Sequence, residues 1–388
     1  MIRQQREQRG MSTTALAARV GCTTRHIELL EQGKRTPSLP LLRQLALALG
    51  VRTAVLLGES PRDSHEPGRP QVVDIERAMF ARRTTTDLEP PDAAQVAERL
   101  TAARQSWYNS PAKYSIMLRT LPGLIGDAEG LLLDSGDRQA AHRTAADTYI
   151  LARGVLKHLG RIDLAHLAAD RAMRHAQETA EPLMVGWAHW NLGQGLLSDD
   201  MHDIAYDVAR RGMEQMKRAL ADGDERHLSV YGGLHLMAAI ALTRSGDDAG
   251  ARDLLSGPAY QIAQRVDERQ PMLGLFFGPT NVAIHLASVE YEMRRPGAVI
   301  RLADGIDLTQ VVSTERRTTH LCQVARACED SGDDAASLVH LLRIERECPE
   351  ELDHKRLLRD MVRSLARRAR SSWAPEVRYL AERHKILL

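Results

Sequence analysis

Cysteine and histidine are the residue types of this chain that most readily support metal binding or nucleophilic catalysis, and their spacing favours neither. The four cysteines, Cys22, Cys322, Cys328 and Cys348, form no CxxC pair, and His320 precedes Cys322 without a second pair to complete a metal site. The closest histidines along the chain are eight positions apart, about 12 Å on one helix, which is too far to share an ion. We therefore expect reduced thiols and no metal or other cofactor.

The sequence also lacks the short motifs of common enzymes. No P-loop GxxxxGK[ST], GxGxxG, HExxH or GxSxG occurs. Gly193 and Gly195 flank Gln194 inside a helical pattern, where close helix packing explains them better than phosphate binding. We predict that the chain is not an enzyme, and we treat an enzyme regulated through its N-terminal domain as the third and weakest hypothesis.

Positive charge gathers at the N-terminal end. Residues 1–60 hold nine Lys or Arg against four Asp or Glu, a net charge of +5, whereas the other 328 residues have a net charge of −4. A small basic domain on a mildly acidic body is typical of a protein whose N-terminal domain meets a polyanion.

No apolar run reaches the roughly 18 residues that a membrane-spanning helix needs. The opening residues, MIRQQREQRG, are polar and lack the apolar stretch of a secretion signal. These features predict a cytoplasmic protein with no membrane partner.

Capping signals divide the first sixty residues into short helices. Ser12 and Thr23 are good N-caps, and Gly21 and Gly33 are good C-terminal stops. A further helix is expected over 41–49. The turn between the second and third helices is only GCT, and two short helices joined by so tight a turn form a helix-turn-helix unit.

The run RQQREQRGMSTTALAARVGCTTRHIELLEQGKRTPSLPLLRQLALALGV resembles the Xre/Cro family of phage and bacterial repressors. The shared positions are Arg6, Gly10, Leu16, Ala17, Gly21, Ile27, Glu31, Gly33, Pro37, Leu45, Ala46, Leu49 and Gly50. The resemblance covers about 15% of the chain. It implies a five-helix, lambda-repressor-like DNA-binding domain in which the second helix of the helix-turn-helix, the recognition helix, enters the major groove.

By this resemblance, five side chains of the recognition helix face the bases. Arg25 suits the O6 and N7 acceptors of guanine, or else a phosphate, and Glu28 suits the N4 donor of cytosine. The hydroxyl of Thr24 can donate to a base edge or its methyl can meet thymine, and His26 can reach a base edge or only a phosphate. The full set of candidate base contacts is Thr24, Arg25, His26, Glu28 and Leu29.

A second set is expected to contact the DNA backbone, which positions a protein without reading sequence. Thr13 stands where the family often has glutamine, so its shorter side chain departs from the pattern. The alternative for the basic members is plain solvent exposure. The set is Thr13, Thr23, Lys34, Arg35 and Arg43.

The remaining chain is predicted to be a linker followed by a helical body. We assign 1–60 to the DNA-binding domain, 61–92 to a linker with a short helix, and 93–388 to a helical repeat domain for effector binding and dimerisation. The linker is rich in Pro, Gly and charge. Its short amphipathic segment, VDIERAMFARR, either packs on the body or contributes to a dimer interface.

Three similar turns in the body, GRIDLA, GDDAGA and GDDAAS, and two weaker ones indicate a repeat. Aligned on the last turn residue, they place small residues twelve positions earlier and residues that can be buried nine positions earlier, with Arg153 as the exception among the small ones. This pattern resembles the tetratricopeptide repeat, although the intervals of 37 to 49 residues are longer. It implies five to seven helix pairs stacked as a right-handed α-solenoid, so the expected fold class is all-α.

Such stacks present the first helix of each pair on a concave surface. Aromatic and amide groups there suit a peptide or an amphipathic small molecule, although both tryptophans could equally be core residues. The candidate effector-binding residues are Trp187, Trp190, Asn191, Gln194, His235, His285 and Glu292.

A helix-turn-helix head on a repeat body resembles the peptide-pheromone receptors of Gram-positive bacteria and a set of actinomycete regulators. The leading hypothesis is therefore a homodimeric, sequence-specific transcriptional regulator that binds an inverted repeat in double-stranded DNA and responds to a peptide or small molecule. The alternative is an interaction scaffold that tethers a protein partner to DNA without a small effector. The basic run Arg363 to Arg370 is either a solvated helix face or a second DNA contact.

Overall fold

The computed structural model describes residues 2–35, 37, 39–49, 51, 53–56, 69–81, 91–134, 136–220, 224–270 and 274–388. Contacts between Cα atoms divide the chain into two compact units, Met1–Arg69 and Pro70–Leu388. Over the described ranges every regular element is a helix, which confirms the all-α prediction. None of the helices in those ranges is both long and apolar enough to cross a bilayer.

The first unit contains the expected five helices. They are α1 (Ile2–Gln8), α2 (Thr13–Arg19), α3 (Thr24–Glu31), α4 (Leu39–Ala48) and α5 (Thr53–Leu56).

Both predicted N-caps of this unit are confirmed. The Ser12 hydroxyl accepts a hydrogen bond from the backbone N–H of Ala15 at 3.0 Å, and the Thr23 hydroxyl accepts one from His26 N–H at 3.2 Å. Gly33 has a φ of 70°, and the backbone N–H that follows it bonds to the Leu29 carbonyl at 2.9 Å, which ends α3. The turn chemistry in the sequence therefore fixes where α3 begins and ends.

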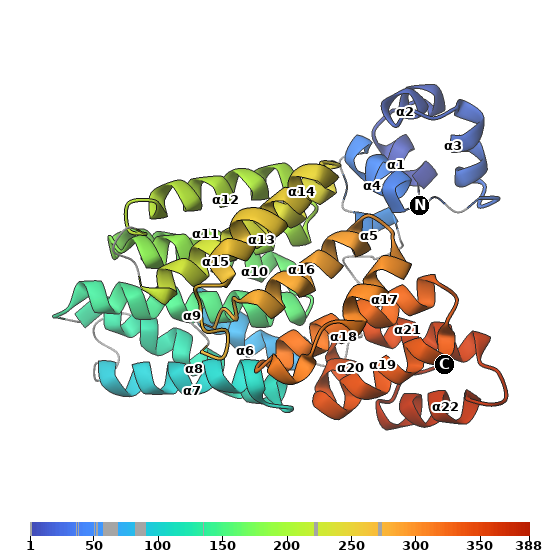
Figure 1. The fold of residues 1–388 in the computed structure, drawn as a ribbon. Helices are drawn as coiled ribbons and strands as arrows, with labels where there is room; N and C mark the ends of the chain where they lie inside the picture. The colour runs from blue at the N-terminus through green and yellow to red at the C-terminus, as the bar shows by residue number, and fades with distance from the viewer. Residues whose placement is uncertain are drawn as a thin grey trace. The chain divides into compact units, whose positions relative to one another are not determined.

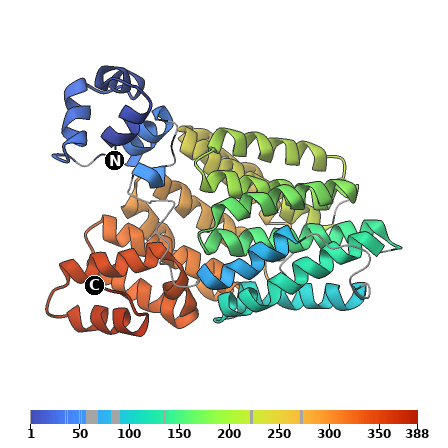
Figure 2. The ribbon, with the colours of Figure 1, turned by 180° about the vertical axis from the view of Figure 1, so that it is seen from behind.

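The second unit is built from the remaining helices, whose course Figures 1 and 2 show from two sides. They are α6 (Arg69–Phe80), α7 (Ala93–Asn109), α8 (Lys113–Asp134), α9 (Arg138–His158), α10 (Ile162–Glu178), α11 (Pro182–Ser198), α12 (His202–Met216), α13 (Glu225–Ser245), α14 (Asp248–Leu254), the π-helix η1 (Leu255–Ala259), α15 (Tyr260–Ala263), α16 (Pro279–Glu292), α17 (Pro296–Asp304), the 3₁₀-helix η2 (Leu308–Gln310), α18 (Thr314–Asp330), α19 (Asp334–Glu347), α20 (Glu350–His354), α21 (Arg356–Arg368) and α22 (Ala374–Arg383).

Neighbouring helices of the second unit pack as pairs, in the order in which they follow one another along the chain (Figure 1). The five turns that defined the repeat join or begin the second members of the pairs α9/α10, α11/α12, α13/α14, α16/α17 and α18/α19. With α7/α8 and α21/α22, the described part of the unit contains seven pairs, at the upper end of the expected range.

Small residues at the predicted positions let successive first helices approach closely. A Cβ atom added to Gly193 of α11 would collide with the side chain of Met237 on α13, and Ala239 and Ala325 are fully buried. Ala165 and Ala205, from the aligned turns, are also fully or almost fully buried. The small residues are therefore required by packing, because interiors at native density have no room for extra atoms.

The short helix α6 belongs to the core of the second unit. Val72, Ile75 and Met79 are buried at 3%, 0% and 2% exposure, and they join the main apolar cluster of that unit. Of the predicted linker, 61–68 and 82–90 lie outside the described residues. Packing on the body, one of the two alternatives for this segment, is therefore what the structure shows.

The first helices of the pairs contact one another in a closed circuit. Contacts run from α7 to α9, α11, α13, α16 and α18, and α18 returns to α7. At the closing junction, the hydroxyls of Ser313 and Thr314 donate to the backbone carbonyls of Tyr108 and Asn109 at 3.2 and 3.3 Å. A polar junction therefore holds the two ends of the series together.

Candidate nucleic-acid interface and interior polar cluster

Helix α3 buries one face and presents the other. Ile27 and Leu30 are buried at 0% and 6% exposure in the core of the first unit. Of the predicted base contacts, the Arg25 side chain is 73% exposed, whereas the other four are partly buried and keep some surface: Thr24, His26, Glu28 and Leu29. The residues that the sequence selected thus lie together on the side of α3 away from the core.

Charged groups on this face are paired within the unit. The Arg25 guanidinium Nη1 lies 3.2 Å from Glu28 Oε2, one helical turn away. Arg35 Nη1 lies 3.3 Å from His26 Nδ1. Such exposed pairs are weak and exchange easily with other partners, so a polyanion that approaches this face can compete for both guanidinium groups.

A stronger, half-buried ion pair fixes α3 against α1. Arg6 Nε and Nη2 donate to the two carboxylate oxygens of Glu31 at 2.6 and 2.9 Å, and Arg6 Nη1 donates to the Met11 carbonyl at 2.8 Å. The hydrogen bond to Glu31 raises the pKa of Arg6 above its usual value. Because two parallel bonds define a direction as well as a distance, this pair sets the orientation of α3.

The predicted backbone-contacting residues surround α3. Thr23 caps the helix, and Lys34 and Arg35 are exposed just beyond its C-terminal end. Thr13 begins α2 and is partly buried, as is Arg43 of α4. Their placement at the ends of the helix-turn-helix and on the next helix is compatible with phosphate contacts.

Residues 2–56 match the helix-turn-helix family, which covers all five helices of the first unit. The first unit matches a helix-turn-helix domain of the Xre type. Within it, α2 and α3 form the helix-turn-helix motif.

A comparison with curated proteins found no match to this chain. Among solved structures, it is similar to the crystal structure of PlcR from Bacillus thuringiensis in complex with the peptide PapR7 and DNA. That match covers 68% of this chain and 92% of PlcR at 14% identity, with a TM-score of 0.28.

The structure brings several predicted effector-binding residues together on α11. The rings of Trp187 and Trp190 stack with centroids 4.7 Å apart, but Trp187 is 1% exposed and belongs to the core. Asn191 is fully buried, and its side-chain oxygen accepts a hydrogen bond from Arg153 Nε. Gln194, one turn further on, is partly buried.

The other three candidates lie on α13 and α16. His235 is buried, with Nδ1 2.9 Å from the Tyr231 carbonyl. His285 Nδ1 is 2.8 Å from Arg316 Nη2, and burial together with that arginine lowers the pKa of His285 to about 3, so the ring is neutral. Glu292 forms an ion pair with Arg244 at 2.7 Å. The carboxylate predicted to contact an effector is therefore already bound to an arginine of the same domain.

Sequence reasoning missed the cationic residues of the interior. In the repeat pattern Arg153 is only an exception to the small position, and the pattern does not point to Lys157 or Arg316. In the structure Arg153 is 6% exposed and turns toward Asn191 and Trp190. The signal was present, because an arginine at a position reserved for small residues has to be accommodated by polar neighbours.

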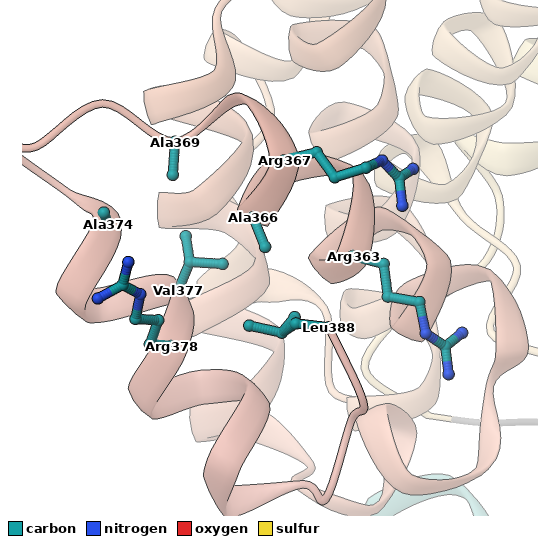
Figure 3. A pocket seen from close by; sticks show the side chains of 8 residues that line it. All are labelled: Arg363, Ala366, Arg367, Ala369, Ala374, Val377, Arg378 and Leu388. Atoms are coloured by element: carbon teal, nitrogen blue, oxygen red, sulfur yellow. The ribbon is translucent and has the colours of Figure 1, made fainter.

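The basic run of α21 is divided between paired and exposed arginines. Arg368 binds Asp334 and Glu329, both at 2.7–2.8 Å, whereas Arg367 is exposed. A surface pocket of about 350 Å³ lies between α21 and α22, as Figure 3 shows. Its lining residues are Arg363, Ala366, Arg367, Ala369, Ala374, Val377, Arg378 and Leu388. A second DNA contact on this run stays a prediction.

Over the described residues, no group of three or more His, Cys, Asp or Glu is arranged to hold a metal ion. The cysteines there are free thiols, and burial raises the pKa of Cys348 to about 11 and also raises that of Cys322.

Proposed function

We propose that this chain is a sequence-specific DNA-binding transcriptional regulator whose repeat domain binds a peptide or small-molecule effector. The observation that carries the proposal is the outward face of α3 in a helix-turn-helix domain, where Arg25 and four neighbouring candidate base contacts lie together. An exposed helix of this size fits the major groove, which alone distinguishes all four base pairs.

The domain makes two kinds of contact with DNA: contacts to base edges, which read sequence, and contacts to phosphates, which position the protein. Arg25 donates two hydrogen bonds to a guanine after exchanging its exposed partner Glu28, while Thr24 and His26 meet neighbouring base edges. Lys34 and Arg35 lie where α3 ends and bind phosphates. The net charge of +5 over residues 1–60 adds a sequence-independent attraction that falls with salt.

A single helix-turn-helix reads only a few base pairs, so we expect a homodimer that places two copies of α3 on one side of the duplex. The operator is then an inverted repeat whose half-sites lie about one helical turn, or a multiple of it, apart. The effector acts by favouring one arrangement of the two domains over another, which requires different affinities for the two states.

Selection of bound duplexes from a random pool, with the full-length protein at two salt concentrations, tests the DNA-binding part. We expect an inverted repeat to be enriched and its affinity to fall steeply as salt rises. Recovery of unrelated sequences, or no salt-dependent binding to any duplex, would show that α3 does not read DNA.

Fluorescence anisotropy on the selected duplex tests the effector part. Peptide and small-molecule fractions of bacterial culture medium are titrated into the protein–DNA complex. A shift in DNA affinity supports an effector. Capture of a defined protein partner, with no response to any small-molecule fraction, would favour the interaction scaffold instead.

A further inference from the structure

The interior of the repeat domain holds a buried arginine. Arg153 of α9 is 6% exposed. Its Nε donates to Asn191 Oδ1, and its guanidinium carbon lies 5.7 Å from the centre of the Trp190 ring. In the described part of the chain no carboxylate forms an ion pair with it. Buried arginines are normally neutralised, because an unpaired buried charge is costly.

Two further cations lie in the same cluster. Lys157 follows Arg153 by one helical turn and forms no ion pair within the described ranges. Arg316 of α18 has its Nη2 at 2.8 Å from His285 Nδ1, and its Nε is buried without a hydrogen-bond partner. Glu315, next to Arg316, is the carboxylate that faces these cations, and it is engaged by His158 Nε2 at 3.4 Å.

Charges from several helices act on Lys157 at once. Burial is the largest cause that lowers the pKa of Lys157, the charges of Arg153, Arg244 and Lys355 also lower it, and Glu315 raises it; together they bring the pKa to about 7. These residues belong to α9, α13, α18 and the segment before α21, so the amine lies among the inner helices. Burial also lowers the pKa values of Arg153 and Arg316 to about 10.

The cluster therefore carries more positive than negative charge. Three cationic side chains face one carboxylate, and the nearby pairs Arg244–Glu292 and Arg104–Asp147 are each neutral. Hydrogen-bonding capacity is unused as well, since Asn191 Nδ2 is buried without a partner. An anion bound here would supply both the missing hydrogen-bond acceptor and the missing negative charge.

We propose that Arg153, Lys157 and Asn191 form an anion-binding subsite of the effector site, and that the effector binds there through a carboxylate. A carboxylate can accept from the Arg153 guanidinium, the Lys157 amine and Asn191 Nδ2 together. The Trp190 ring, which stacks on Trp187, lies 5.7 Å from the Arg153 guanidinium carbon and so borders this position. This inference rests on the proposed control of the repeat domain by an effector.

Anion binding at this position couples to proton uptake. A negative charge beside Lys157 favours its protonated form and raises its pKa. Because burial lowers the pKa of this amine to about 7 in the free protein, binding near pH 7 should take up protons, and binding at pH 5 should take up almost none. Calorimetry in two buffers of different ionisation enthalpy measures this uptake.

The test uses the full-length protein and two matched peptide libraries. One contains N-acetylated hexapeptides with a free C-terminal carboxylate, and the other has the same sequences as C-terminal amides. Retention is measured by affinity selection and mass spectrometry, with acetate and inorganic phosphate as competitors. We expect the free acids to be retained at least about tenfold more tightly, because each charge-assisted hydrogen bond is strong when buried. Displacement by acetate alone would assign the subsite to a small free acid rather than to a peptide terminus.

Variants separate binding from folding. Arg153→Met removes a buried charge and Lys157→Met a partly buried one, and each retains an unbranched apolar side chain. Both variants should weaken retention of the acids at least about tenfold without lowering the melting temperature. Lys217→Met, at an exposed lysine on the C-terminal end of α12, is the control and should leave retention unchanged. A purely structural role would lower the melting temperature and leave acid and amide binding equal.

The outcomes distinguish the two proposals. Equal retention of acids and amides, or no retention of either library, overturns the anion subsite. If amides and acids alike change DNA affinity, control by an effector stands without the subsite. If acids bind through Arg153 and Lys157 but DNA affinity does not change, the subsite stands and effector control of DNA binding fails.

Discussion

Arg25 and Glu28 form an ion pair on the outward face of α3, with Nη1 3.2 Å from Oε2 and side-chain exposures of 73% and 41%. The glutamate restrains the arginine in the free protein, and its own charge opposes the approach of phosphates. The two residues therefore have opposite effects on general attraction to DNA, although both lie where bases are read.

Glu28→Gln should bind a random-sequence duplex about threefold more tightly at low salt, because one negative charge is removed from the DNA-facing surface. Fluorescence anisotropy measures the affinity. Glu7→Gln, which removes a carboxylate that pairs with Arg3 on α1, is the matched control and should have less effect. Equal gains for the two variants would show that the face of α3 is not the one that meets DNA.

The pair between Arg6 and Glu31 predicts a local stability effect. Glu31→Ala leaves the Arg6 guanidinium half-buried without its carboxylate and should destabilise the first unit by about 2 kcal/mol. Hydrogen exchange of the amides in 2–56 measures this loss in the full chain. Arg3→Ala, which breaks an exposed pair, should leave protection unchanged; equal loss of protection in both variants would argue against an orienting role for Arg6.

The closing junction of the repeat domain contains a buried carboxylate between two lysines. Glu351 is fully buried, with Lys113 Nζ 2.5 Å from Oε1 and Lys355 Nζ 2.8 Å from Oε2. Tyr114 and Thr318 donate their hydroxyls to the same carboxylate at 3.2 and 3.1 Å. Burial alone would raise the pKa of Glu351, but the two lysines outweigh it and lower the pKa to about 2.

This lowered pKa gives a signed dependence of stability on pH. The stabilisation is fully present above the ordinary glutamate pKa of about 4.5 and is lost as the pH falls from there toward 2. Glu351→Gln should be destabilised by about 3–5 kcal/mol at pH 7, because the buried Lys113 and the partly buried Lys355 lose their partner. Thermal unfolding across this range should show a shallower slope for the variant than for the unmodified chain. Parallel slopes would mean that Glu351 is not the titrating group.

Close packing at Gly193 can be tested by adding one methyl group. Gly193→Ala places a Cβ against the fully buried Met237 and should destabilise the repeat domain by about 1–3 kcal/mol. Gly126→Ala in α8, where a Cβ meets no atom within 4 Å, should instead stabilise by about 0.5–1 kcal/mol through helix propensity.

A double-mutant cycle shows whether the clash is the cause. Met237→Ala should cost less in the Gly193→Ala background, because the new methyl group occupies part of the space that the methionine leaves. Additive free energies of unfolding would remove the steric explanation and, with it, the packing reason for a small residue at this repeat position.

Local signals in the sequence were sufficient to predict the helix caps and the outward face of α3 in the first unit. Ser12, Thr23 and Gly33 act through neighbouring backbone groups, so their effects can be predicted without knowing the rest of the fold. The outward face of α3 follows from the burial of Ile27 and Leu30 one turn apart. The pairing of Arg25 with Glu28 is also local, at a spacing of three residues.

The interior of the second unit depends on contacts that no local pattern contains. Lys113 and Glu351 are 238 positions apart in the sequence. They meet because the later helices α18 and α20 pack against α7 and α8. The repeat pattern predicted which residues pack, but not that the series closes on itself. Arg153 was visible as a departure from that pattern, and only the position of Asn191 shows what it binds.

Base-by-base substitution of the selected operator, measured with the unmodified chain and with Arg25→Ala, tests most directly whether α3 reads sequence. Arg25→Ala should lose about 1–3 kcal/mol of discrimination at one guanine in each half-site and keep discrimination elsewhere. An equal loss of affinity for every sequence, with all preferences retained, would contradict this prediction and assign Arg25 to a phosphate.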